Sequence, residues 1–193
     1  VVGFDCSGKG AVAEYLRDQH GFQSYSLSDM IREEATSRGL DLKTETLIAL
    51  GRELREQYGN GVLADRVMKK LEPNKRYVIE SIRHPDEVKT LKGKVQFSLV
   101  AIDAPLQDRW QRFNSRRREG EQISLEEFAK RDSRAFFSPE AGQQIGVCMT
   151  LAQYRLYNPE AVTVEELHSQ VDNVLQKLER PDWDKYFLNI MDA

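Results

Sequence analysis

The segment from Gly3 to Ala11 carries glycines and a lysine at a spacing that suits the binding of a phosphate. Four residues separate Gly3 from Gly8, and Lys9 follows directly. Glycines allow the backbone to turn tightly around an anion, and the lysine adds a mobile positive charge beside the β- and γ-phosphates of a nucleotide. We therefore predict a nucleotide-binding P-loop made by Gly3, Ser7, Gly8, Lys9, Gly10 and Ala11.

Several residues of this segment depart from the common form of the motif. The common form places Ser or Thr directly after the lysine, where the hydroxyl contacts Mg²⁺, but this chain has Gly10 followed by Ala11. Asp5 and Cys6 lie inside the loop, where an acid repels phosphate unless it points outward. A chance glycine-rich turn is the alternative interpretation. The segment therefore predicts nucleotide binding and leaves catalysis open.

A P-loop needs a strand before it and a helix after it, and the flanking residues supply both. The β-branched pair Val1-Val2 precedes the loop, and a helical pattern runs from Lys9 to Gln19. Further strands are predicted over 23–27, 76–82, 95–102 and 154–157. Helices are predicted over 28–39 with Ser28-Asp29 as the cap, and over 44–58, 62–71, 85–91, 105–116, 124–134, 143–151 and 163–178 with Thr163 as the cap.

Strands that alternate with helices predict an α/β fold, a three-layer α/β/α arrangement with a parallel sheet covered on both faces. Ligands of such sheets lie at the carboxyl ends of the strands. The P-loop, residues 80–83 and Asp103 all follow strand ends in the sequence. We therefore expect them to converge on one side of the sheet.

The composition narrows the class of protein. The 193 residues carry a net charge of −3, with 40% hydrophobic and 31% charged residues and a pI near 5.7. This balance argues against a general nucleic-acid binder. Cys6 and Cys148 have no metal-ligand spacing and favour a reducing compartment. Without an apolar run long enough to cross a membrane, we expect a cytoplasmic or nuclear protein with no membrane partner.

Residues 1–178 resemble the P-loop nucleoside monophosphate kinases. The Gly8-Lys9-Gly10 sequence is similar to the loop of those enzymes, which usually continue with Thr. Residues 26–32, Ser-Leu-Ser-Asp-Met-Ile-Arg, resemble the Ser-Thr-Gly-Asp-Met-Leu-Arg segment of adenylate kinases. The resemblance implies a kinase fold with a helical lid. It also implies acceptor-binding roles for Asp29 and Arg32.

Two further segments extend the resemblance. Residues 78–83 take the place of the family's strand that ends in Asp-Gly-Phe-Pro-Arg, which implies that Glu80 holds Mg²⁺ through water and that Arg83 contacts the acceptor phosphate. Residues 109–118 resemble the arginine-rich start of the kinase lid, which implies that Arg112 and Arg116 bind the donor nucleotide. Arg131 and Arg134, farther along the lid, are candidates for closing onto the transferred group.

These residues suit phosphoryl transfer, which depends on positioning and on positive charge over an anionic transition state. The resemblance implies ATP and Mg²⁺ as cofactors, and a catalytic set of Lys9, Arg83, Arg112 and Arg116. In the alternative interpretation the arginine run is a solvated helix face and Glu80 is a surface acid. The histidines, which share no metal-ligand spacing, are expected to be structural or solvent-facing: His20, His84 and His168.

Residues 179–193 carry a second resemblance. The segment Arg-Pro-Asp-Trp-Asp-Lys-Tyr-Phe at 180–187 resembles the opening of deoxycytidylate (dCMP) deaminase domains. The zinc-binding His-x-Glu and Pro-Cys-x-x-Cys motifs of that chemistry do not occur in this sequence. We expect a longer chain, with residues before Val1 and a deaminase domain after 193 through which an oligomer could form. An amphipathic tail that folds back on the domain is the alternative.

Two functions from different classes are therefore predicted. The first is an ATP-dependent kinase for nucleoside or deoxynucleoside monophosphates. The second is a catalytically impaired kinase-like domain that binds nucleotide and regulates or scaffolds the deaminase. Asp5, Cys6 and Ala11 favour the second, whereas the retained Lys9 and arginines favour the first. A dephospho-coenzyme A kinase or a shikimate-type kinase is a third candidate with the same fold.

Overall fold

The computed structural model describes residues 1–117, 122–136, 138 and 142–179. In chain order its elements are α1 (Lys9–His20), β1 (Gln23–Ser26), α2 (Leu27–Ser37), α3 (Thr44–Tyr58), α4 (Val62–Met68), β2 (Tyr77–Glu80), α5 (Pro85–Lys94), β3 (Val100–Asp103), α6 (Leu106–Ser115), α7 (Leu125–Phe136), α8 (Ile145–Thr150), β4 (Tyr154–Tyr157) and α9 (Val164–Glu179).

The strands form a parallel arrangement with the start of the chain at its centre. β1 pairs with β2, and β3 pairs with β4, each in parallel. Val1 donates from its amino group to the Ile79 carbonyl (2.6 Å), and Val2 forms a parallel bridge with Ala101. The segment before the P-loop therefore lies between β2 and β3. This arrangement confirms the predicted α/β fold with a parallel sheet.

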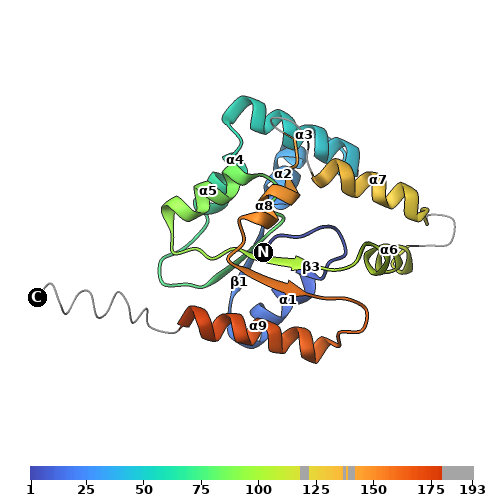
Figure 1. The fold of residues 1–193 in the computed structure, drawn as a ribbon. Helices are drawn as coiled ribbons and strands as arrows, with labels where there is room; N and C mark the ends of the chain where they lie inside the picture. Colours follow the sequence, from blue (N-terminus) through green and yellow to red (C-terminus); the bar gives the residue numbers. More distant parts are fainter. Residues whose placement is uncertain (118–121, 137, 139–141, 180–193) are drawn as a thin grey trace, which may run out of the picture.

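Helices cover both faces of these strands, and each face has its own core (Figure 1). Neighbouring strand residues point to opposite faces, as the period of a strand requires. Val1, Val78 and Ile102 pack with α1 and α9, whereas Val2 and Ile79 pack with the helices of the other face. The second core includes buried residues of α2, α3, α4, α5 and α8. The three-layer prediction is confirmed.

Most predicted elements are present, with two corrections. Ser26, not Ser28, precedes the first residue of α2, so the predicted Ser28-Asp29 cap lies inside the helix. The strand predicted over 95–102 begins only at Val100. Leu99 is fully buried although it lies outside the strand, because its N–H and carbonyl bond Gln153 and Tyr154. The predicted strand was therefore too long: Val95 and Gln96 are exposed, and the first fully buried residue of this segment is Leu99.

The prediction for the start of α9 is confirmed. Thr163 donates its N–H to the Glu166 carboxylate (2.8 Å), and Glu166 donates its own N–H to the Thr163 hydroxyl (3.2 Å). This reciprocal pair is a capping box. It begins the helix that covers α1 on the face away from α5.

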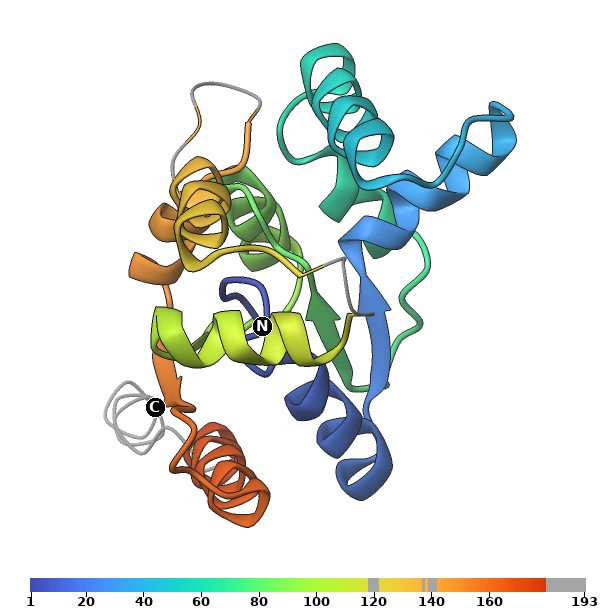
Figure 2. The same cartoon turned by 90° about the vertical axis from the view of Figure 1, so that its right-hand side faces the viewer.

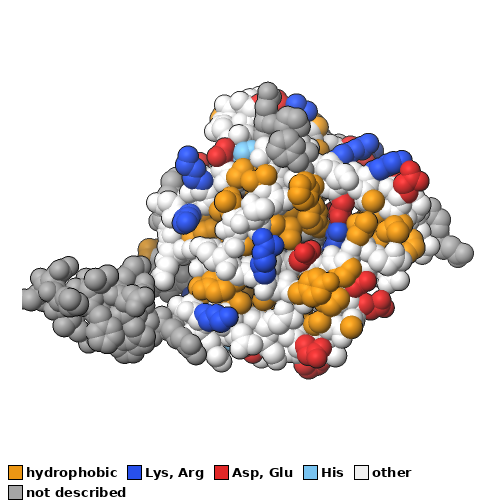
Figure 3. All heavy atoms as spheres, in the orientation of Figure 1, with side chains coloured by type: hydrophobic (Ala, Val, Ile, Leu, Met, Phe, Trp, Pro, Cys, Tyr) orange, Lys and Arg blue, Asp and Glu red, His pale blue; other side chains and the backbone are white. Residues whose placement is uncertain are grey.

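The helical lid consists of α6 and α7. Figure 2 shows α6 crossing in front of the P-loop, with α7 on one side and α2 and α3 on the other. On the face shown in Figure 3, apolar side chains form several separate patches between charged ones. Among the described residues, no helix is both long and apolar enough to cross a membrane.

Candidate functional site

The backbone between Val2 and α1 has the conformation that its glycines permit. Gly8 has a φ of 110° and directly precedes α1. Cys6 adopts the left-handed region at a φ of 61°, which is uncommon for a residue with a side chain. A Cβ atom added at Gly3 would lie 2.3 Å from the Ile102 carbonyl oxygen. The loop therefore curls closely over the end of β3 and leaves the N-terminus of α1 facing the loop.

Lys9 lies inside this loop. Its ammonium group donates to the carbonyl oxygens of Gly3 (2.9 Å) and Phe4 (2.7 Å). Desolvation in the loop lowers the pKa of Lys9 to about 8, and the nearby Arg83 acts in the same direction, whereas the charge of Asp5 opposes the shift. The cation is therefore held inside the loop by backbone carbonyl groups.

Ser7 and Asn158 meet beneath the loop. The Ser7 side chain is buried, and its hydroxyl is without a hydrogen-bond partner in the described part of the chain. Asn158 follows β4 and donates its side-chain amide to the Ser7 carbonyl (2.9 Å). A Cβ atom at Gly8 would lie 2.4 Å from that amide nitrogen. Asn158 thus fixes the loop from a distant element, a role that the sequence did not reveal.

The lid arginines contact the loop through its carbonyl groups. Arg112 donates to the carbonyls of Cys6 (3.4 Å) and Asn158 (2.9 Å). Arg116 is exposed, and its charge acts to lower the pKa of the Cys6 thiol, although burial of the thiol has the larger effect and raises that pKa. Both predicted donor-side arginines therefore lie beside the P-loop.

Arg109 is the most buried lid arginine among those described, and no site role was predicted for it from the sequence. Its guanidinium donates to the Asp5 carbonyl (3.4 Å) and pairs with Asp132 of α7. It also lies over the ring of Phe4, 5.1 Å from the ring centre. Arg109 therefore ties α6 to both the loop and α7.

Arg83 approaches the P-loop from the segment that follows β2. Its guanidinium lies 3.8 Å from the Asp5 carboxylate and donates to the Gln143 side chain (2.9 Å). The charge of Arg83 lowers the pKa of Lys9, and the charge of Glu80 raises it. The structure therefore brings Lys9, Arg83 and Glu80 into one electrostatic neighbourhood, as expected from the convergence of strand ends.

Arg32 of α2 contacts a chain of hydrogen-bonded serine hydroxyls. It donates to the Ser28 hydroxyl (2.8 Å) and pairs with Asp29 at 3.4 Å. Ser28 in turn contacts Ser26 (2.8 Å), which donates to Ser81 (2.9 Å). The hydroxyls link the ends of β1 and β2. Arg32 and Asp29 are both about half exposed, so they are accessible to a solute at this edge.

Glu80 is the acid predicted to hold Mg²⁺ through water, and it makes a long side-chain hydrogen bond. Glu80 ends β2 and accepts a long hydrogen bond from the Ser24 hydroxyl (3.4 Å). The described residues include no group of three acidic, histidine or cysteine side chains that could hold a metal by themselves. A magnesium ion here would therefore need oxygen atoms from the nucleotide and from water.

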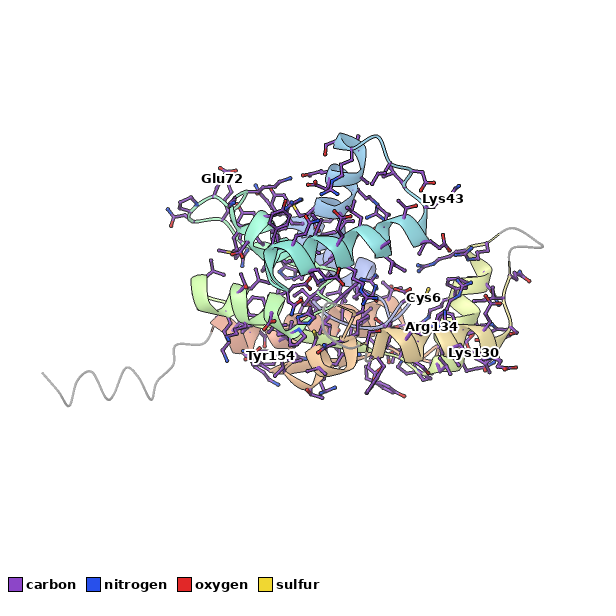
Figure 4. All side chains as sticks on the ribbon, turned by 90° about the horizontal axis from the view of Figure 1, so that it is seen from above. Cys6, Lys43, Glu72, Lys130, Arg134 and Tyr154 are labelled. Carbon is purple, nitrogen blue, oxygen red and sulfur yellow. The ribbon has the colours of Figure 1, made fainter. Side chains whose placement is uncertain are left out.

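The distal lid arginine Arg131 is paired within its own helix. Arg131 pairs with Glu127 on its own helix (2.7 Å) and lies over the Phe113 ring. In the view from above, Arg134 is on the side of α7 nearer Cys6, whereas Lys130 lies farther along the helix (Figure 4). The geometry thus separates the loop-contacting arginines from Arg131.

The three histidines have structural surroundings, as predicted. His20 bonds Asp172 (2.9 Å), and His168 stacks on the ring of Tyr15. His84 is buried and caps α5 by accepting the Asp86 N–H (3.1 Å). The contacts of His20 and His168 join α1 to α9, and the contact of His84 begins α5.

Comparison with known proteins places the chain in a family. The sequence pattern of the AAA domain matches residues 1–136. A UPF0200 protein of Hyperthermus butylicus is 31% identical over 180 residues, which are 92% of each chain. The chain belongs to the UPF0200 family. A UPF0200 protein of Thermococcus gammatolerans is 30% identical and covers 93% of this chain and 94% of its own.

Solved structures place this UPF0200 chain in the fold of the P-loop kinases. Shikimate kinase from Bacteroides thetaiotaomicron aligns with a TM-score of 0.59 at 15% identity, over 93% of this chain and 96% of that enzyme. A gluconokinase from Sinorhizobium meliloti aligns with a TM-score of 0.55 at 13% identity, over 97% and 94% of the two chains. At these identities the likeness shows the fold alone.

The predicted deaminase resemblance has no support from these comparisons. Apart from Glu179, which pairs with Arg76 (3.1 Å), the segment 179–193 lies outside the described residues. The relatives above are UPF0200 proteins, and none of them is named as a deaminase. What is established is a kinase-like P-loop domain.

Proposed function

We propose that this UPF0200 domain, residues 1–178, is an ATP-dependent kinase that transfers the γ-phosphoryl group to a nucleoside or deoxynucleoside monophosphate. The observation that carries the proposal is the position of Lys9, whose ammonium group lies inside the loop on the carbonyls of Gly3 and Phe4. A half-buried cation held on backbone carbonyls is positioned to exchange them for phosphate oxygens.

The residues of the loop fit a polyphosphate. The buried Ser7 hydroxyl lacks a partner among the described residues, so an anion in the loop would give it one. The backbone at Gly8 opens the N–H groups of α1 toward the same space, where a helix favours negative charge. Lys9 and Gly8 would hold the β- and γ-phosphates, and Arg112 and Arg116 would neutralise them from the lid side.

Magnesium supplies charge neutralisation and orientation of the phosphates when it is bound. Glu80 is the residue of this chain that would hold it, through water. Ala11 offers no hydroxyl at the place where related loops carry one. The chain's own contribution therefore rests on Lys9 and the arginines.

Arg83, Arg32 and Asp29 form the proposed acceptor side. Arg83 reaches the P-loop from the end of β2, and Arg32 stands at the end of β1 with its guanidinium half exposed. Two guanidinium groups spaced along one sheet edge suit a phosphate, because each can donate two parallel hydrogen bonds. The serines of this edge add donors and acceptors for a sugar.

Calorimetric titration tests the proposal. The domain is titrated with ATP·Mg²⁺ and then with dCMP, dUMP and AMP, and phosphoryl transfer is followed by separating the products. Lys9→Ala is the loop variant, and Lys43→Ala, an exposed lysine between α2 and α3, is its control. We expect Lys9→Ala to weaken ATP binding about 100-fold and the control to bind normally. Tight ATP binding with transfer to none of the monophosphates would contradict the kinase.

A second candidate function is a nucleotide-binding domain that regulates or scaffolds a dCMP deaminase domain in the same protein. The exposed Asp5 carboxylate beside Arg83 favours this candidate, because its negative charge would repel the phosphate of an acceptor monophosphate bound next to the loop. Binding of dCTP without transfer to any monophosphate would support this candidate. Sequencing the complete transcript would show whether a deaminase domain with its zinc motifs follows residue 193.

A further inference from the structure

Glu87 and Arg55 form an ion pair in the interior, away from the P-loop. Glu87 of α5 is fully buried and Arg55 of α3 is nearly so. The Arg55 guanidinium donates to one oxygen of the carboxylate through two nitrogens, at 3.1 and 3.3 Å, and to the Gly51 carbonyl at 3.3 Å. A charge so completely removed from water persists only with full pairing.

The second oxygen of Glu87 has a different task. It accepts the backbone N–H groups of Arg83 (2.8 Å) and His84 (3.1 Å). The carboxylate therefore fixes the peptide groups that carry the predicted acceptor arginine. A glutamate is almost never fully buried unless it is paired. Here Arg55 supplies the pair.

The backbone that Glu87 fixes aims the Arg83 side chain. The Arg83 carbonyl accepts the Gln144 N–H (2.7 Å), so the residue is held on both of its peptide groups. Its guanidinium is then placed between Gln143 and the Asp5 carboxylate. A small rotation of this backbone would swing the guanidinium away from the P-loop.

Arg55 also connects this contact to the helix that bears Arg32. A Cβ atom at Gly51 would lie 2.9 Å from the end of the Ile31 side chain and 3.6 Å from the Arg55 guanidinium. Ile31 directly precedes Arg32 in α2. The same place on α3 therefore contacts α2 on one side and, through Glu87, the Arg83 backbone on the other.

We propose that Glu87 and Arg55 are positioning residues that hold Arg83 toward the P-loop and keep it in register with Arg32. Glu87 holds the backbone of Arg83, and Arg55 balances the buried charge of Glu87 from α3. The proposal rests on the proposed function, since it assigns these residues to the acceptor side of that kinase.

The first variant is Glu87→Gln, which keeps the size of the side chain and removes its charge. The Arg55→Met and Glu87→Met double variant removes both charges together, and such apolar replacements of buried pairs commonly preserve folding. The double variant removes the acceptor of the Arg83 and His84 N–H groups, whereas Glu87→Gln leaves a single neutral amide oxygen, which cannot serve both these N–H groups and Arg55 as the carboxylate does. Lys89→Gln, an exposed change on the same helix, is the control.

Steady-state kinetics separates positioning from a general loss of structure. We expect both variants to raise the KM for the monophosphate about tenfold while the KM for ATP stays within about twofold. The control should leave both constants unchanged. An unchanged acceptor KM in the double variant, or equal rises in both constants, would overturn the proposal.

Amide hydrogen exchange tests the same contact without any turnover. The Arg83 and His84 amides should exchange at least about tenfold faster in the double variant than in Lys89→Gln. Unchanged protection would overturn the positioning role even in an active enzyme. Lost protection in a protein that transfers phosphate to no monophosphate would instead contradict the proposed kinase and leave the contact established.

Discussion

The P-loop is formed by one continuous segment, residues 3–9, whereas the position of Arg83 depends on contacts from three other parts of the chain. The loop owes its shape to the positive φ of Gly8 and to the close approach of Gly3 to the Ile102 carbonyl, which leaves no room for a side chain. Arg83 owes its place to Glu87, Gln143, Gln144 and, through Glu87, Arg55. The loop therefore follows mainly from its own backbone geometry, with Asn158 as a distant support, whereas the position of Arg83 follows from long-range contacts.

This difference determines how each side should respond to substitution. A local loop fails when its backbone is obstructed, and no distant residue compensates. A side chain held by several distant partners is displaced from its functional position in steps, as each partner is removed. The donor side should thus show one large, all-or-none effect, and the acceptor side a series of smaller effects.

The largest effect is expected for Gly8→Ala. At a φ of 110° an L side chain is strained, and its Cβ would lie 2.4 Å from the Asn158 amide nitrogen. We expect the affinity for ATP·Mg²⁺ to fall at least about 100-fold, measured by calorimetry. Gly10→Ala is the matched control, because a Cβ there meets no atom within 4 Å. Equal losses in the two variants would show that the loop does not depend on the conformation at Gly8.

The next effect concerns the acceptor side alone. Arg83→Lys keeps the charge but loses the planar group that donates to Gln143 and faces Asp5. We expect the KM for the monophosphate to rise about 30-fold with ATP affinity unchanged. Arg52→Lys, an exposed arginine paired with Glu56, is the control. A loss of ATP affinity in Arg83→Lys would place Arg83 on the donor side instead.

The pKa of Lys9 predicts a pH dependence on the donor side. The pKa of about 8 in the protein without nucleotide means that the charged form of Lys9 prevails at pH 7 and the neutral form at pH 9. Because phosphate favours the charged form, binding should raise the pKa and take up a proton near pH 8. ATP affinity should fall about tenfold from pH 7 to pH 9.

Calorimetry in buffers of different ionisation enthalpy measures that proton uptake. Lys9→Arg serves as the comparison, since an arginine stays charged throughout this range. Its weaker dependence on pH would assign the effect to Lys9. An affinity that is flat between pH 7 and pH 9 in the unmodified protein would contradict the assignment.

Features that depend on neighbouring residues, such as helix bounds and helix caps, could be predicted from the sequence. Helix α3 has the predicted bounds, Thr44–Tyr58, and the Thr163 cap of α9 is confirmed. The fold class followed from the alternation of strands and helices. The composition of residues 95–99 does not distinguish them from the strand that follows, because apolar residues occur both in paired strands and in unpaired segments that lead into them.

The residues that sequence reasoning missed act across long separations. Asn158 reaches the loop from 151 positions away, and Arg55 reaches Glu87 from 32. Nothing local distinguishes a buried Arg55 from an exposed Arg52 on the same helix. Glu87 gave a weak signal, because an acid two positions after Pro85 suits the first turn of a helix.

The smallest effect is expected at the point where the two sides meet. The Asp5 carboxylate is 63% exposed and lies 3.8 Å from the Arg83 guanidinium, so water screens the pair and weakens it. Asp5→Asn removes a negative charge from the loop that would hold phosphate, and it leaves Arg83 its bond to Gln143. We expect ATP affinity to rise about threefold and the acceptor KM to change little.

Adding Ala11→Thr to Asp5→Asn then asks whether the loop is limited by the acid or by the missing hydroxyl. Ala11 is exposed at the start of α1, so the larger side chain has room. If transfer rises only in the double variant, the hydroxyl is limiting, and if Asp5→Asn alone gives the whole gain, the acid is. A fall in the transfer rate on Asp5→Asn would show that the carboxylate serves the acceptor side. In that case Asp5 joins Arg83 as a group held for the acceptor, and the boundary between the two sides runs through the loop itself.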